Sequence, residues 1–158
     1  MNLKTTVAFP SLDWFRALQE RMNAAEERYR TYGYADARVV FKIDANDRLP
    51  HTRLFGLVFE TYGCAEVREL QESDTEGFDC DFILQGPYKA WREMIENVQA
   101  NGQADPDHTL NRLSLLQHPF SIHGTDQLRV DLFFRQQFSF QAFIDESAAV
   151  ETSFPTSG

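Results

Sequence analysis

The sequence predicts an α+β fold in which one leading helix is followed by a group of strands and then by a group of helices. Four segments before residue 85 are rich in alternating apolar residues, many of them β-branched or aromatic, as is typical of strands. After residue 86 the apolar residues recur at intervals of three and four, as is typical of helices that bury one face. Grouped strands and helices favour a mostly antiparallel sheet over an alternating parallel arrangement.

Composition narrows the class of protein. A chain of 158 residues suits one domain with a substantial core. It carries 14 phenylalanines, yet 25% of its residues are charged, so we expect neither a disordered nor a membrane-spanning protein. The formal net charge of -9 disfavours nucleic acid as a partner, because such binding depends on Lys and Arg releasing phosphate counterions. Residues 1–10 lack the basic start and apolar run of a signal peptide, so we expect a cytoplasmic protein.

No residue pattern predicts a cofactor, a metal or a catalytic site. Cys64 and Cys80 lie in predicted strands without metal-type spacing, so two free buried thiols are expected. His118 and His123 are five residues apart, which places them on opposite faces of a strand and disfavours a shared metal with Asp126. No serine lies in a Gly-x-Ser-x-Gly sequence, so hydrolase chemistry has no support.

The leading helix is predicted to start at Ser11, whose side chain suits a helix cap. Its apolar residues recur at three and four positions and should lie against a sheet, while its other side is charged and should face solvent. The apolar positions are Leu12, Phe15, Leu18, Met22, Ala25 and Tyr29.

Four strands are predicted at residues 39–43, 53–59, 64–70 and 78–84, joined as an antiparallel meander, with a polar loop at 71–77. In the last strand Asp79 and Asp81 alternate with apolar residues. We therefore expect an exposed acidic strand face rather than a pair of catalytic carboxylates.

The second half is predicted to contain two helices and a fifth strand. Gly86-Pro87 suits the start of the first helix, and Asn101-Gly102 suits its end. The sequence at 105–107 repeats the start signal for a short second helix. The apolar stripes are Trp91, Met94, Ile95 and Val98 on the first helix, and Leu110, Leu113 and Leu116 on the second; Phe120 and Ile122 mark the strand.

A final aromatic helix is predicted from Asp126 to about Phe138, with apolar residues around more than half of its circumference. Either the helix is buried on two sides, or its additional aromatic surface lines a ligand cavity or a dimer contact. For residues 138–144 the pattern fits a strand and a helix equally. Residues 147–158 are expected to form a flexible tail.

The order of elements from Cys80 to Phe134 resembles the second half of the sterol carrier protein 2 (SCP2) lipid-binding domain. The matching features are a strand of aspartates alternating with apolar residues, an aromatic early in a helix, an Asp-Pro step, an apolar helix, and a strand that ends in Gly. Here these are Cys80-Asp81-Phe82-Ile83-Leu84, Trp91, Asp105-Pro106, Leu110 to Leu116, and Phe120 to Asp126. The resemblance extends from Leu12 to about Phe138. Gln117-His118-Pro119 departs from it, because the family usually has a small residue or Gly there.

The resemblance implies a five-stranded, mostly antiparallel sheet covered on one face by helices that enclose an apolar tunnel. It implies a non-enzymatic carrier of a sterol, fatty acid, acyl-coenzyme A or isoprenoid lipid, without a cofactor. The expected domain covers residues 11–146, between an N-terminal extension of residues 1–10 and the tail of residues 147–158. The expected lining residues are Phe55, Phe82, Trp91, Met94, Ile95, Leu113, Leu116, Phe133, Phe134 and Phe138.

Two other classes of function remain open from the sequence. One is a small cone-shaped enzyme similar to nuclear transport factor 2, with His123 as its candidate catalytic residue; its usual order, helices before a long run of strands, differs from the order here. The other is a module that binds a protein or a second copy of itself through the Phe-rich segment 138–144.

Overall fold

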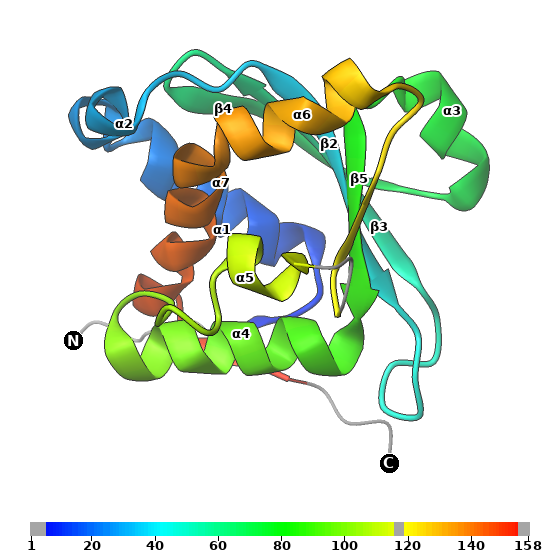
Figure 1. The fold of residues 1–158 in the computed structure, drawn as a ribbon. Helices are drawn as coiled ribbons and strands as arrows, with labels where there is room; N and C mark the ends of the chain where they lie inside the picture. The colour runs from blue at the N-terminus through cyan, green and yellow to red at the C-terminus, as the bar shows by residue number, and fades with distance from the viewer. Residues whose placement is uncertain (1–5, 116–118, 155–158) are drawn as a thin grey trace.

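The computed structural model describes residues 6–115 and 119–154. Its centre is a five-stranded sheet in the order β4-β3-β2-β5-β6 (Figure 1). The strands are β2 (Ala37–Asp44), β3 (Arg53–Glu60), β4 (Gly63–Leu70), β5 (Phe82–Pro87) and β6 (Ser121–His123). The predicted α+β class and the mostly antiparallel five-stranded sheet are therefore confirmed.

The predicted meander is wrong at its fourth strand. β2, β3 and β4 pair antiparallel as expected, but β5 pairs with β2 in parallel, with Phe82 opposite Val39. β5 also begins four residues later than predicted, at Phe82 rather than Phe78. The alternation at 78–81 resembles a strand, but Asp79 is left-handed, with a φ of 52°, which interrupts an extended backbone.

The segment between β4 and β5 is helical rather than the predicted loop. It forms the short 3-10 helix η1 (Glu72–Asp74) and then α3 (Thr75–Phe78), on the face of the sheet away from the other helices (Figure 1). Phe78 packs there in a small second core with Val40 and Val58. A Cβ on Gly56 would lie 2.8 Å from the Phe78 ring, so this position requires glycine. The chain that leaves β4 can therefore cross the far face of the sheet and enter β5 parallel to β2.

The remaining helices cover the opposite face of the sheet (Figure 1). They are α1 (Leu12–Asn23), α2 (Glu26–Tyr32), α4 (Tyr88–Asn101), α5 (Leu110–Leu113), α6 (Gln127–Arg135) and α7 (Gln137–Asp145). The Ser11 hydroxyl accepts a hydrogen bond from the Trp14 amide, as the predicted cap requires. The single predicted leading helix is divided into α1 and α2 at residues 24 and 25. The undecided segment 138–144 lies within α7.

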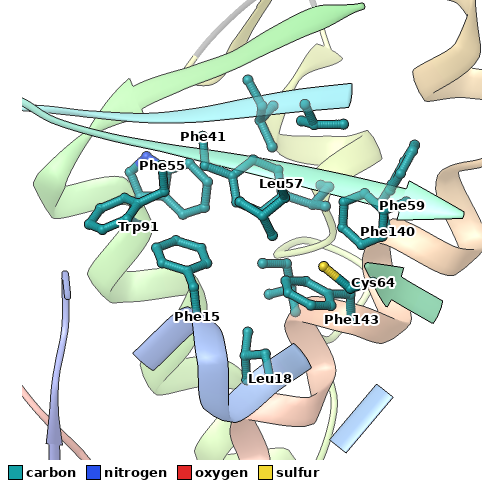
Figure 2. Packing of buried hydrophobic residues seen from close by; sticks show 14 of the residues in the cluster. Phe15, Leu18, Phe41, Phe55, Leu57, Phe59, Cys64, Trp91, Phe140 and Phe143 are labelled. Carbon is teal, nitrogen blue, oxygen red and sulfur yellow. The ribbon is translucent and has the colours of Figure 1, made fainter. Parts of the chain in front are cut away.

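The main core lies between this helical layer and the sheet. Phe41, Phe55 and Leu57 extend from β2 and β3 towards Phe15 and Leu18 of α1 (Figure 2). Trp91 of α4 and Phe140 and Phe143 of α7 complete the same cluster (Figure 2). Alternate strand residues therefore supply one continuous apolar face, as the period of two predicts.

Both ends of the described chain are packed against the domain. Strand β1 (Val7–Ala8) pairs in parallel with β7 (Thr152–Ser153), and Phe9 is fully buried against the Trp14 ring. The Trp14 indole donates to the Thr152 hydroxyl at 3.0 Å. The packed structure therefore extends beyond the expected limits of residues 11 and 146, and residues 147–153 are not a flexible tail. Residues 1–5 and 155–158 lie outside the described ranges.

A buried carboxylate joins the C-terminal segment to the first two helices. Glu146 opens the 3-10 helix η3 (Glu146–Ala149) and is buried. It accepts hydrogen bonds from the Arg28 guanidinium, from Arg21 Nε at 3.2 Å and from the Tyr29 hydroxyl at 2.8 Å. Burial and the Glu146 charge raise the pKa of Tyr29, so its hydroxyl keeps the proton that it donates.

We expect Glu146→Gln to lower the free energy of unfolding by about 2 kcal/mol, because it leaves two guanidinium groups without their shared negative charge. Arg21 and Arg28 are half exposed, so water replaces part of the lost interaction. Urea unfolding at neutral pH measures the change. Glu27→Gln, the same chemical change on the exposed side of α2, is the control and should have almost no effect. Equal midpoints for the two variants would contradict a stabilising role for Glu146.

Candidate functional site

The predicted lining residues occupy the inner face of the sheet and the helices that cover it. Phe55 of β3 and Phe82 of β5 point into the main core, where Trp91, Met94 and Ile95 of α4 are fully buried. Phe133 of α6 is buried as well, and Leu113 of α5 is half buried against the core. Phe134 and Phe138 are exposed. Leu116 lies outside the described residues.

Three rings meet where α6 crosses the sheet. The Phe82 ring lies 5.8 Å from Phe133 and 5.6 Å from Phe140, both edge to face, and Phe133 lies 6.2 Å from Phe140. We call Phe82, Phe133 and Phe140 the Phe82 cluster. The sequence predicted two of its members. It missed Phe140 because the secondary structure of residues 138–144 could not be decided from the pattern.

Further rings continue from the Phe82 cluster towards α4. Phe59 and Phe143, also absent from the predicted set, connect the cluster to the centre of the sheet, since Phe59 contacts both Phe140 and Phe143 at 5.2 Å. Phe143 reaches Phe41, which contacts Trp91 at 5.7 Å. The predicted residues on β5, α4 and α6 are thus joined through intervening rings. Phe55 contacts Phe15 of α1 instead, at 4.6 Å.

The described side chains of this interior are in close contact. The residues of the Phe82 cluster and the predicted residues of α4 have almost no exposed surface. Hollows lined by described residues occur elsewhere: one of about 400 Å³ lies beside α4 and the β2–β3 turn, and one of about 650 Å³ lies beside β1 and β7. None of the predicted lining residues lines either hollow.

Helix α6 covers the Phe82 cluster with one fully buried residue, while its Val130 and Leu132 are partly buried against the core. Phe133 is its buried residue, while Leu128 is 76% exposed and Phe134 is 42% exposed. At the next helix Phe138 is 67% exposed. The surplus aromatic surface that the sequence predicted for this helix therefore faces solvent in part. It forms an apolar outer surface of Leu128, Phe134 and Phe138 around the junction of α6 and α7.

An ion pair fixes the first turn of α6 to the start of β5. Arg129 Nε donates to Asp81 Oδ1 at 3.1 Å, and Arg129 Nη1 to Asp79 Oδ1 at 3.4 Å. The other Asp81 oxygen accepts the Arg38 amide of β2 at 2.8 Å. Asp81 is therefore half buried and bonded on both oxygens, so the expected exposed acidic strand face is wrong there. Asp79 is exposed as expected, but both residues precede β5.

The two ends of α6 depart from regular helix geometry. At its start Asp126 caps the helix by accepting the Arg129 amide, after the sequence Gly124-Thr125. At its end Gln136, with a φ of -115°, separates α6 from α7. The Gln136 side-chain oxygen is buried and has no hydrogen-bond partner among the described residues. An orphaned acceptor of this kind costs folding free energy unless a donor reaches it.

The histidine and cysteine side chains offer little chemistry. His123 is exposed on β6, and its Nε2 lies 2.7 Å from the Ser121 hydroxyl, rather than in a buried pair with an aspartate. Burial raises the pKa of Cys64 to about 12, and burial also raises the pKa of the half-buried Cys80. Both thiols therefore stay protonated at neutral pH. Within residues 6–115 and 119–154, no group of three or more His, Cys, Asp or Glu could hold a metal ion.

Searches with this fold find sterol carrier proteins among solved structures. The solution structure of a conserved hypothetical protein from Thermus thermophilus, described as a candidate sterol carrier protein, aligns with a TM-score of 0.63 at 12% identity over 99% of this chain and 100% of that one. A crystal structure of sterol carrier protein 2 aligns with a TM-score of 0.59 at 12% identity, over 87% of this chain and 95% of that one. The chain therefore has an SCP2-like fold.

Sequence comparison gives no match: neither a protein-family model nor a curated protein matches this chain. The likeness thus rests on three-dimensional arrangement. No helix among the described residues is long and apolar enough to cross a membrane.

We expect Phe133→Ala to lower the free energy of unfolding by about 3 to 4 kcal/mol, because it removes a buried ring and leaves a cavity above Phe82. Phe138→Ala is the matched control, since the same truncation there removes a ring that is largely in water and should cost less than about 0.5 kcal/mol. Urea unfolding followed by circular dichroism measures both. Similar losses for the two variants would show that α6 is not held through Phe133.

Proposed function

We propose that this chain binds and carries a hydrophobic ligand between its sheet and the helices α4 to α7, without catalysing a reaction. The observation that carries the proposal is the arrangement of α6, which covers the Phe82 cluster with one buried residue, Phe133, and presents Leu128 and Phe134 to water. The SCP2-like fold supports it, since both structures reported above are associated with sterol carriage.

In the proposed cycle the side chain of Phe133 occupies the place that an acyl chain or ring system takes when bound. Its removal from the core costs about 2 to 3 kcal/mol of hydrophobic free energy. Ten methylene groups leaving water would supply about 8 kcal/mol at about 0.8 kcal/mol each. Further apolar contacts with Leu128 and Phe134 would offset part of the ordering cost, so the balance is compatible with micromolar affinity. The expected tunnel then exists only in the loaded protein.

The attachment of α6 suits this role. Apart from Phe133, its described contacts with the sheet include the ion pairs of Arg129 with Asp79 and Asp81 near the protein surface. The pair with Asp79 is exposed and contributes little net stability, and the pair with Asp81 is only partly buried, so together they position the helix. The junctions at Gly124-Thr125 and at Gln136 are the places where the backbone can absorb a rotation.

The buried oxygen of Gln136 gives a preference among the expected cargoes. Gln136 ends α6 three residues after Phe133, and its buried oxygen lies at this end of the helix. A ligand hydroxyl that enters beside Phe133 would supply the donor that this oxygen lacks. Within the class of sterols, fatty acids, acyl-coenzyme A esters and isoprenoid lipids, we therefore propose a hydroxyl-bearing lipid such as a sterol. The aromatic walls alone do not discriminate, because the hydrophobic effect is non-directional.

The apolar outer surface of Leu128, Phe134 and Phe138 supports a second proposal, a homodimer formed by this face. In the dimer a second copy of the chain covers these side chains, whereas in the empty carrier they face water. Sedimentation at increasing protein concentration distinguishes them: a dimer that Phe138→Asp abolishes, in a protein that takes up no lipid, would favour the interface over the carrier.

The cysteines and the net charge support a proposal for the cellular setting. The two free thiols are consistent with a reducing compartment, and we propose the cytoplasm. The formal net charge of -9 supports a carrier without a nucleic-acid partner.

The first test is native mass spectrometry of the freshly purified protein, with organic extraction of the same sample and identification of the released compound. We expect one lipid per chain, or, for an empty sample, saturable uptake of a fluorescent fatty acid and of a fluorescent sterol, with the sterol bound more tightly. Gln136→Leu should reduce that preference and leave the fatty acid affinity largely unchanged. A sample that is empty and takes up neither probe would refute lipid carriage.

A second test concerns the attachment of α6. Arg129→Gln removes the ion pairs with Asp79 and Asp81, so we expect a fluorescent fatty acid to load several-fold faster in stopped-flow measurements, with a loss of stability below about 1 kcal/mol. Arg135→Gln, on the same helix and without a described ion pair, is the control. Equal loading rates for Arg129→Gln, Arg135→Gln and the natural sequence would exclude α6 movement as the step that admits the ligand.

A further inference from the structure

A polar hollow of about 400 Å³ lies between α4 and the turn that joins β2 to β3. It shares no lining residue with the proposed lipid site, and the inference below does not depend on that proposal. Charged side chains of both signs surround it, and one tyrosine from the first turn of α4 forms part of its wall. The lining residues are Asn46, Asp47, Arg48, Tyr88, Lys89, Arg92, Glu93 and Glu96.

The distinguishing feature of this hollow is the hydroxyl of Tyr88. The residue is only 1% exposed, and its ring is stacked on that of Phe9 at a centroid distance of 6.4 Å. The hydroxyl is buried and its proton has no acceptor among the described residues, although the Arg92 guanidinium lies close enough to donate to its oxygen. A buried hydroxyl without an acceptor is unfavourable, so its presence where phenylalanine would pack equally well needs a cause.

The charges closest to this hydroxyl belong to the lining of the same hollow. Burial raises the pKa of Tyr88, while the positive charges of Arg92 and Arg48 oppose the increase. A guanidinium group carries donors only, so neither arginine can accept the hydroxyl proton. Among the described residues the hydroxyl proton of Tyr88 therefore has no acceptor, and the positive charges beside it belong to the same hollow.

Two of the carboxylates on the rim are already engaged. Arg92 Nε donates to Glu96 Oε1 at 3.0 Å, and Lys89 Nζ lies 3.9 Å from Glu93 Oε1. The Arg92 guanidinium also lies over the Phe154 ring at 5.0 Å, a second contact that helps to position it. The acidic side chains Asp47, Glu93 and Glu96 balance the charges of Arg48, Lys89 and Arg92, and this overall neutrality favours a small anion of low charge over a polyanion.

We propose that this hollow binds an oxyanion, a phosphate or carboxylate group, which accepts hydrogen bonds from the Tyr88 hydroxyl and from the guanidinium groups of Arg48 and Arg92. Arginine suits this role because its planar donors match the geometry of both anions. The neutral hydroxyl adds a donor on the buried side of the wall, where the lower dielectric strengthens a hydrogen bond. The group can belong to a free small molecule or to the head of a lipid.

The test is a titration of the whole chain with inorganic phosphate and, separately, with acetate, followed by two-dimensional amide NMR. We expect saturable shifts at residues 46–48 and 88–96. Tyr88→Phe, which removes only the hydroxyl, should weaken the better of the two anions by about tenfold or more. Tyr34→Phe is the control, because Tyr34 is 59% exposed and remote from the lining. A third titration with dihexanoyl phosphatidic acid distinguishes the sources, since a head group would bind more tightly than free phosphate.

Stability without any anion gives an independent readout. If the hydroxyl has no partner in the free protein, Tyr88→Phe should leave the urea unfolding midpoint unchanged or raise it. A lower midpoint for Tyr88→Phe would mean that the hydroxyl is satisfied within the chain, and the proposal would be wrong. Unsaturable shifts, or equal anion affinities for Tyr88→Phe and the natural sequence, would also overturn it. A protein that takes up no lipid but binds the anion through Tyr88 would refute the lipid proposal and support this one.

Discussion

The parallel pairing of β5 with β2 determines most of the arrangement described above. At the start of the pairing the Asp81 amide donates to the Arg38 carbonyl at 2.6 Å, and an Asp81 carboxylate oxygen accepts the Arg38 amide at 2.8 Å. This double link sets the register in which Phe82 lies opposite Val39, so Phe82 faces the helical layer. The other carboxylate oxygen holds Arg129 of α6. One aspartate thus positions both the floor of the candidate site and the helix that covers it.

Local signals in the sequence predicted the elements well. Local backbone chemistry determines the caps at Ser11 and Asp126 and the end of α4 at Gly102. Each depends on only a few neighbouring residues, so each can be predicted from the sequence. The partner of β5 could not be predicted in this way. Whether Phe82 pairs beside β4 or beside β2 depends on the crossing of α3, and that crossing depends on Phe78 fitting against Gly56 on the far face. Neither the crossing of α3 nor the fit of Phe78 against Gly56 produces a periodic pattern in the sequence.

The candidate site shows the same division between local and tertiary information. The apolar stripe of α4 predicted that Trp91 and Met94 would be buried, because their spacing defines one helix face. It could not distinguish Phe133 from Phe134, which are adjacent in a helix with apolar residues on most sides. Burial of Phe133 and exposure of Phe134 depend on where α6 crosses Phe82. The buried polar atoms of Gln136 and Tyr88 could not be predicted at all, since the lack of a hydrogen-bond partner leaves no pattern in the sequence.

A filled interior is compatible with a carrier that must be stable both empty and loaded. A preformed apolar tunnel of useful size would cost the empty protein several kcal/mol, because each lost contact is uncompensated and the cavity stays dry. In the proposed carrier Phe133 fills that space, and a ligand would then displace one side chain rather than none. The displaced ring would enter an environment that already holds Leu128 and Phe134, so its apolar surface would not be isolated in water. The same reasoning does not apply to the hollow beside Tyr88, because a polar hollow that is open to solvent need not be filled by a side chain. An acceptor for the Tyr88 hydroxyl can therefore come from outside the chain.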